Sequence, residues 1–155
     1  MIDEAAVQGL IDRAAVSDVV HAYATAVDSR DWGLFGSLFA DTLFLDFRSF
    51  HPSLYKTVTR EELIGITRSI EGLDATQHLS TQHRHSIDGN RATCISYMHA
   101  GHFLTREGQQ HACFLYGHYT YELVRNGPGW IIDRYGLQIT ARFGEPRLFE
   151  WAGML

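Results

Sequence analysis

Three histidines crowd one short segment, and their type suggests either proton transfer or metal binding. Residues 74–85 read DATQHLSTQHRH and contain His78, His83 and His85. Imidazole changes its charge near neutral pH and is also a common metal ligand. Zinc sites need closely spaced Cys and His side chains that converge on one point. The segment is therefore a metal site, an acid–base site or a polar stretch of sheet.

Strand alternation separates the three histidines. If this segment is a β-strand, His78 points to one face and both His83 and His85 point to the other. The face of His78 is otherwise polar, with Thr76, Ser80 and Gln82. His83 and His85 lack an evident third ligand, so we expect solvated sheet residues there and no metal. His78 is either a core histidine bonded to a backbone group or a functional one.

Asp28 is the second candidate, because it ends the predicted helix VVHAYATAVD. A carboxylate at the negative end of a helix dipole costs several tenths of a kcal/mol. One explanation is an Asx-turn that leads into Ser29 and Arg30. The other is a carboxylate aimed at an imidazole, where it fixes the tautomer and stabilises the imidazolium.

The first third of the chain is predicted to be helical. An apolar stripe at spacings of three and four comprises Val16, Val19, Val20, Tyr23 and Val27. We expect Asp12 to cap this helix, with an earlier turn around residues 5–10, and Asp31 to cap a second helix over 32–40. A strand over 42–50 and a loop with Pro52 follow. Thr59 and Glu62 form a capping box for a third helix that ends near Gly72.

After Gly72 the pattern changes to strand-like alternation. Four long strands are predicted, over about 75–87, 91–105, 111–125 and 130–142. Asp88-Gly89, Glu107-Gly108 and Asn126-Gly127 supply the turns. Helices followed by a run of antiparallel strands indicate an α+β fold, with one curved sheet wrapped against the helices. Such a sheet leaves a cavity at its wide end.

Length and charge exclude several functional classes. The 155 residues predict a single domain over 1–155. The net charge of −5, without a Lys/Arg cluster, argues against nucleic-acid binding and against an anionic membrane surface. The opening MIDEAAVQGL lacks the pattern of a signal peptide, and no apolar run approaches the ~18 residues of a membrane span. We expect a cytoplasmic protein.

The two cysteines are predicted to be free thiols. A hairpin that turns at Glu107-Gly108 places Cys113 opposite His102 and Cys94 opposite Tyr121. The sulfurs then lie eight strand positions apart, roughly 26 Å. That distance excludes a disulfide and fits a reducing compartment.

Three motifs carry a resemblance to a known family. VDSRDW (27–32), LDFRSF (45–50) and TQH (76–78) resemble the scytalone dehydratase family in order and separation, and RFGE (142–145) echoes its exit segment. The wider group is the SnoaL-like polyketide cyclases and dehydratases of the nuclear-transport-factor-2-like superfamily. The likeness extends from about Asp12 to Glu145.

The resemblance implies a cone-shaped α+β barrel, with three helices packed into a strongly bent mixed sheet around a buried pocket. It assigns the acid–base role to His78 and the helix-ending carboxylate to Asp28. It places a second pocket histidine at His102 and two polar pocket positions at Tyr119 and Tyr121. It also implies a homo-oligomer, with a trimer favoured.

The register leaves one alternative open. A strict two-residue turn at Asp88-Gly89 would pair His78 with His99 instead of placing it on the face of His102. A three-residue turn, or a bulge at Gly101, restores His102.

The sequence departs from the family at two pocket positions. Members that dehydrate scytalone carry tyrosines where this chain has Val27 and Phe47. Tyr23, one turn earlier on the helix, and Tyr55, in a loop that could cover the pocket, are the candidate replacements. The pocket is expected to be apolar, with Phe47, Phe50, Met98, Phe143 and Trp151 nearby.

The predicted function is a cofactor-independent dehydratase that acts on a hydroxylated cyclic ketone by His/Asp acid–base catalysis. His78 takes the proton, Asp28 stabilises the imidazolium, and either the imidazolium or His102 protonates the departing hydroxyl. The expected partner is a small apolar ring compound, besides further copies of the chain that bury outer-face residues such as Phe114 and Tyr116. One alternative is an isomerase of the ketosteroid type or a cyclase. The other is a non-catalytic module, such as a dioxygenase small subunit or a ligand-binding protein.

Overall fold

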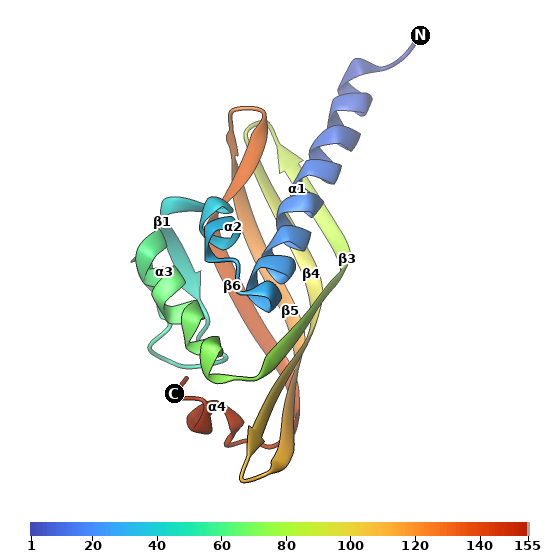
Figure 1. The fold of residues 1–155 in the computed structure, drawn as a ribbon. Helices are drawn as coiled ribbons and strands as arrows, with labels where there is room; N and C mark the ends of the chain where they lie inside the picture. Colours follow the sequence, from blue (N-terminus) through green and yellow to red (C-terminus); the bar gives the residue numbers. More distant parts are fainter. Residues whose placement is uncertain (155) are drawn as a thin grey trace.

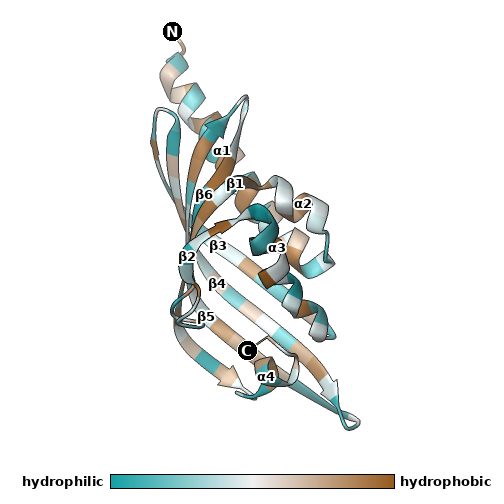
Figure 2. Cartoon of the chain, turned by 90° about the vertical axis from the view of Figure 1, so that its left-hand side faces the viewer, coloured by the Kyte–Doolittle hydropathy of each residue, from teal (hydrophilic) through white to brown (hydrophobic). Residues whose placement is uncertain are grey.

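Six strands form one strongly bent sheet, and the helices lie on one of its faces (Figures 1 and 2). The computed structural model describes residues 1–154. The elements are α1 (Glu4–Ser29), α2 (Trp32–Ser37), β1 (Phe39–Asp46), β2 (Tyr55–Thr59), α3 (Arg60–Thr67), the 3-10 helix η1 (Arg68–Gly72), β3 (Ala75–Asp88), β4 (Arg91–Arg106), β5 (Gln109–Asn126), β6 (Gly129–Gly144) and α4 (Leu148–Trp151).

The sheet has the order β2-β1-β6-β5-β4-β3. β1 runs parallel to β6, and the other neighbours are antiparallel. The expected α+β fold, with N-terminal helices packed into a curved mixed sheet, is therefore confirmed. Two short elements were missed. β2 occupies part of the loop expected after residue 50, and α4 follows the last strand.

The long helix differs from its prediction at its start. α1 begins at Glu4, capped by Asp3, whose side chain accepts from the backbone N–H groups of Ala5 and Ala6. The assignment of Asp12 as the N-cap is wrong. Asp12 is buried inside the helix and receives two hydrogen bonds from Arg125 of β5, at 3.0 and 2.9 Å. The ion pair lets a charged residue sit within the packed part of the helix, while the first turns project past the sheet (Figure 1).

The other helix caps agree with the sequence. The Asp31 side chain accepts from the Leu34 N–H at the start of α2, and Thr59 and Glu62 form the full capping box of α3. α2 is shorter than expected, since the chain enters β1 at Phe39. The 3-10 turn η1 carries the helical segment to Gly72.

The core lies between α1 and the concave face of the sheet. The predicted stripe is buried at Val16, Val20, Tyr23 and Val27. Hydrophobic and hydrophilic positions alternate along the long strands (Figure 2), so that each strand offers one apolar face to the helices. Within residues 1–154, no helix is both long and apolar enough to cross a membrane.

The predicted hairpin register of β4 and β5 is confirmed. Cys94 lies opposite Tyr121, and Cys113 lies opposite His102. Both cysteines are buried free thiols.

A bulge in β3 determines which histidine of β4 lies on the same face of the sheet as His78. The register shifts between Thr81 and Arg84, and Gln82 adopts a left-handed backbone with φ 54°. Neither of the two expected devices, a longer turn or a bulge at Gly101, is used. Because His78 pairs with Ala100, it shares a face with His102, and His99 points to the opposite face.

Candidate active site

A cavity of about 430 Å³ opens between the sheet and the helices. Among the predicted site residues, those that line it are Tyr23, Phe47, Phe50, His78, His102 and Tyr119. Most of the remaining wall is aliphatic, including Leu63, Ile66, Met98 and Leu115. The structure therefore brings a few polar groups together in an apolar chamber, which is the usual composition of a small-molecule site.

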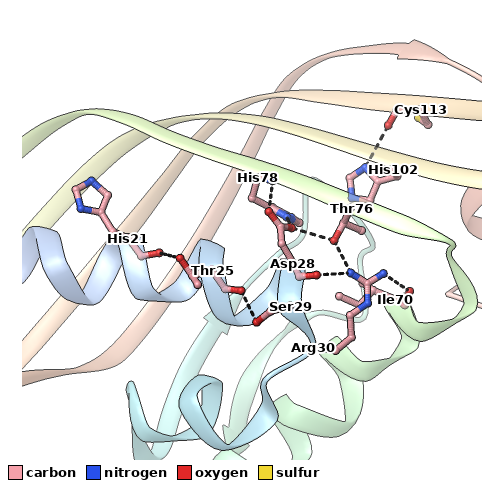
Figure 3. Close-up of polar contacts among 10 residues, drawn as sticks. All are labelled: His21, Thr25, Asp28, Ser29, Arg30, Ile70, Thr76, His78, His102 and Cys113. Atoms are coloured by element: carbon pink, nitrogen blue, oxygen red, sulfur yellow. Dashed lines mark hydrogen bonds and ion pairs between the residues drawn. The ribbon is translucent and has the colours of Figure 1, made fainter.

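Asp28 and His78 are hydrogen-bonded across the boundary between α1 and β3 (Figure 3). The distance from His78 Nδ1 to Asp28 Oδ1 is 2.7 Å, and the His78 backbone N–H donates to Oδ2 at 2.7 Å. Since a carboxylate only accepts, the imidazole proton lies on Nδ1 and Nε2 carries a lone pair. The contact that the sequence predicted between the helix-ending carboxylate and an inward imidazole is confirmed.

Two further residues hold the Asp28 carboxylate in place. The Thr76 hydroxyl donates to Asp28 Oδ1 at 2.9 Å and accepts from Arg30 Nη1 at 3.0 Å. The same nitrogen donates to the main-chain carbonyl of Asp28 at 2.9 Å (Figure 3). Arg30 was not predicted as a site residue. Arg30 ends α1 in a left-handed conformation, with φ 58°, and an arginine at this position gives no sequence signal of that conformation.

The hydrogen bonds keep Asp28 ionised. Burial alone would raise the pKa of Asp28, but the bonds that it accepts from the His78 ring and backbone outweigh burial, and the pKa lies below its usual value. The carboxylate is therefore negative at neutral pH and stabilises a positive charge on His78 when that ring takes a proton.

His102 is a neutral imidazole. Burial, followed by the neighbouring His78, lowers the pKa of His102 to about 4. His102 Nδ1 lies 3.2 Å from the Cys113 carbonyl, which only accepts, so its single proton is on Nδ1. The rings of His78 and His102 are 5.8 Å apart at their centroids. At neutral pH, His102 offers the lone pair of Nε2 and no acidic proton there.

Three tyrosines line the cavity: Tyr23, Tyr119 and Tyr135. Burial raises the pKa of each of them, so all three hydroxyls stay protonated and can donate hydrogen bonds. Tyr135 was missed. It pairs with Tyr121 across β5 and β6, and strand alternation with the buried Leu137 was the signal that could have found it.

Four residues expected at the pocket do not line it. Tyr121 is fully buried behind Tyr23, with the ring centroids 5.9 Å apart. Tyr55 lies on β2, is 46% exposed and packs against Arg48 instead of covering the cavity. Phe143 is 72% exposed on the outer face. Trp151 packs against His111. Loop lengths and a motif match could not fix these orientations.

The bulge also overturns the expectation for His83 and His85. An extra residue in β3 reverses the alternation, so both imidazoles turn toward α1 instead of facing solvent. Ser17 Oγ lies 2.9 Å from His83 Nδ1 and 2.8 Å from His85 Nε2. A third donor, which sequence alternation did not reveal, is Cys94: the three ligand atoms lie within 4.8 Å of one another.

Comparison with known proteins agrees with this fold. The sequence pattern of the SnoaL-like domain matches residues 8–136. Scytalone dehydratase of Pyricularia oryzae is 37% identical over 78 residues, which are 50% of this chain and 43% of that protein. The match thus spans less than half the length of this curated relative.

Solved structures resemble nearly the whole chain. The Kfla4162 protein of Kribbella flavida superposes with a TM-score of 0.82 at 26% identity, covering 94% of this chain and 99% of the other. A type 2 hexachlorocyclohexane dehydrochlorinase has a TM-score of 0.76 at 17% identity, with 90% and 92% covered. Because the profile match covers most of the sequence, the chain belongs to the SnoaL-like domain family, of the nuclear-transport-factor-2-like superfamily.

Proposed function

We propose that this protein is a dehydratase that removes water from a hydroxylated cyclic ketone, using His78 as base and acid. The hydrogen bond of 2.7 Å between His78 Nδ1 and Asp28 Oδ1 carries the proposal. It leaves Nε2 unprotonated on an imidazole that lines an apolar cavity. A base of this kind is suited to taking a proton from carbon next to a carbonyl group.

The reaction uses one imidazole twice. His78 Nε2 takes the proton from the carbon next to the carbonyl, and the electron pair of that C–H bond forms an enolate. The enolate then re-forms the carbonyl, a C=C bond develops, and the C–O bond to the hydroxyl breaks. The His78 imidazolium gives its proton to the departing oxygen, which leaves as water. Asp28 stabilises the imidazolium between the two steps.

The remaining polar groups have complementary roles. A protonated tyrosine among Tyr23, Tyr119 and Tyr135 donates to the enolate oxygen, where charge develops. The neutral His102 accepts a hydrogen bond from the substrate hydroxyl through Nε2. Because that nitrogen carries no proton, we assign the protonation of the leaving group to His78 alone.

The cavity suits a compact ring compound. Its volume of about 430 Å³ lies within the range of roughly 300–1,000 Å³ for small-molecule sites. Phe47 and Phe50 supply aromatic surface to a mainly apolar lining, and Phe47 packs against Tyr135 with the ring centroids 4.6 Å apart. A flat ring that carries one carbonyl and one β-hydroxyl matches an apolar lining with few polar groups.

The relatives support an elimination. One curated relative is a scytalone dehydratase and one structural neighbour is a dehydrochlorinase. Both names describe the loss of a proton and a leaving group from adjacent carbons. Val27 and Phe47 stand at positions where the resemblance expects tyrosines, so we propose a substrate other than scytalone.

The test is turnover of a panel of cyclic β-hydroxy ketones, followed by mass spectrometry of the products. We expect loss of one water with the wild type and background rates with His78→Ala. The panel includes β,γ-unsaturated ketones of the same ring size. If these shift their double bond while no β-hydroxy ketone loses water, the protein is an isomerase, and the dehydratase proposal is wrong.

A further inference from the structure

A second cluster of chemically capable side chains lies away from the cavity. Ser17 on α1 contacts His83 and His85 of β3, and Cys94 of β4 pairs directly with His85. None of these residues lines the cavity that contains His78. Ser17 precedes Asp28 by eleven residues of the same helix, a separation of about 16 Å along the helix axis.

The side chains of the cluster are of the types that bind transition metals. His83, His85 and Cys94 bring two imidazole nitrogens and one sulfur within 4.8 Å of one another. Cys94 is fully buried, and both imidazoles are half-buried beneath α1. The three ligands come from adjacent strands, so the backbone fixes their separation.

The hydrogen bonds of the cluster are incomplete without a further partner. The Ser17 hydroxyl is the hydrogen-bond partner of His83 Nδ1 and of His85 Nε2. The other two ring nitrogens, His83 Nε2 and His85 Nδ1, are buried and have no hydrogen-bond partner among residues 1–154. A buried polar atom without a partner costs about 1–3 kcal/mol.

The Ser17 hydroxyl explains how both nitrogens can become ligands. Its oxygen has two lone pairs and accepts from two imidazole N–H groups at once. With one proton on His83 Nδ1 and one on His85 Nε2, both remaining nitrogens present lone pairs. A metal-bound histidine usually donates its other N–H to an oxygen in this way, which fixes the tautomer and the ring orientation.

We propose that His83 Nε2, His85 Nδ1 and Cys94 Sγ bind one zinc ion, with Ser17 orienting both imidazoles. Binding releases the thiol proton of Cys94 to solvent, and the thiolate offsets one charge of Zn²⁺. Tetrahedral Zn²⁺ places its nitrogen and sulfur ligands roughly 3.3–3.6 Å apart, so the side chains must contract around the ion. Water completes the fourth position.

The bound ion would stabilise the folded structure. It joins β3 and β4 at the bulge, and through Ser17 it ties them to the middle of α1. Because the site lies about 16 Å along α1 from Asp28, it takes no part in the proton transfers proposed above. The predicted absence of a metal rested on the lack of an evident third ligand beside His83 and His85, and Cys94 is a candidate for that ligand.

The test uses Co²⁺ and Zn²⁺ with purified, chelator-treated full-length protein. Cobalt bound by a thiolate gives a sulfur-to-metal charge-transfer band in the near ultraviolet. We expect that band at one equivalent of Co²⁺, its loss on adding Zn²⁺, and a rise in Tm with Zn²⁺. The matched variants are Cys94→Ser and Cys113→Ser, which alter two buried thiols on neighbouring strands.

Cys94→Ser should abolish the charge-transfer band, and Cys113→Ser should retain it. Ser17→Ala should weaken Zn²⁺ affinity by about 10–100-fold, since it removes only the orienting oxygen. If Cys94→Ser does not fold by circular dichroism, His83→Gln and His85→Gln replace it, and each should weaken affinity at least 100-fold. The proposal is overturned if cobalt gives no thiolate band, or if these variants bind Zn²⁺ as the wild type does.

Discussion

Asp28 binds His78 through both of its carboxylate oxygens. Oδ1 lies 2.7 Å from the ring Nδ1, and Oδ2 accepts from the backbone N–H of the same residue at 2.7 Å. One carboxylate therefore fixes both the ring and the strand that carries it. This arrangement explains why an acidic residue stands at the unfavourable end of a long helix, since the bonds to β3 offset the cost of the helix dipole.

Replacing Asp28 by Asn should lower kcat by about 10²-fold or more, with a smaller change in KM. The amide keeps the shape of the side chain but loses the charge that stabilises the His78 imidazolium. Steady-state kinetics on the substrate found by the ketone panel measure this effect. A KM increase with an unchanged kcat would mean that Asp28 serves substrate binding only.

His78→Ala should remove most of kcat, roughly 10²-fold or more, because it removes the imidazole that Asp28 stabilises when the ring takes a proton. His99→Ala is the matched control, since His99 lies on the adjacent strand but faces the opposite side of the sheet. It should keep nearly the full rate. Equal losses in the two variants would indicate a structural effect rather than a catalytic one.

Tyr23→Phe should lower kcat if this hydroxyl donates to the enolate oxygen, by about 10²–10³-fold according to the usual loss of one such donor. Tyr55→Phe is the control, because Tyr55 is exposed on β2 and does not line the cavity. Its kinetics should match the wild type. If Tyr23→Phe also matches the wild type, the same comparison on Tyr119 and Tyr135 identifies the donor.

The outer face of the sheet should bury itself against further copies of the chain, and we propose a homotrimer. Apolar side chains exposed on that face include Leu79, Tyr97, Tyr116 and Phe143. Tyr116 stacks on His99, with their ring centroids 4.7 Å apart, which makes a flat aromatic surface. Light scattering at micromolar concentration should give three times the monomer mass. Tyr97→Ser with Phe143→Ser should shift the mass toward the monomer, and a monomeric wild type would contradict the proposal.

Local signals predicted most of the fold. Thr59 and Glu62 predict a helix start because their side chains satisfy backbone groups within one turn. Gly89, Gly108 and Gly127 predict the hairpins because glycine adopts the positive φ that tight turns need. Asp12 shows where this fails. An Asp within a helical pattern is a good cap by itself, and only its distant partner Arg125 explains why the helix runs through it.

The site was predicted in part, and the bulge of β3 explains the difference. Asp28 and His78 each carried a local peculiarity, one at a helix end and one on a polar strand face. No sequence signal marks the unusual conformation of Gln82, although its φ of 54° reverses the direction of every later side chain on the strand. Alternation arguments hold only as far as the next bulge. The same limit hid the convergence of His83, His85 and Cys94.

The low pKa of His102 should make the protein less stable in mild acid. In the folded chain the pKa of His102 is about 4, against an ordinary value of about 6.5 in the unfolded chain. Between these values the unfolded chain binds a proton that the native state does not, so stability falls as pH decreases from about 6.5 to about 4. From pH 7 to pH 5, this residue alone should cost about 2 kcal/mol.

His102→Gln tests this linkage, because the glutamine amide can still donate to the Cys113 carbonyl but cannot take up a proton. The ionisable groups that act on His102 are His78 and Asp28, and both stay in place in the variant. Urea unfolding at pH 7 and at pH 5 should show a smaller loss for His102→Gln than for the wild type. His51→Gln, an exposed position, should lose as much as the wild type. Equal losses in all three proteins would mean that His102 is protonated as readily in the native state as in the unfolded chain, and its assignment as a neutral acceptor in the cavity would then be wrong.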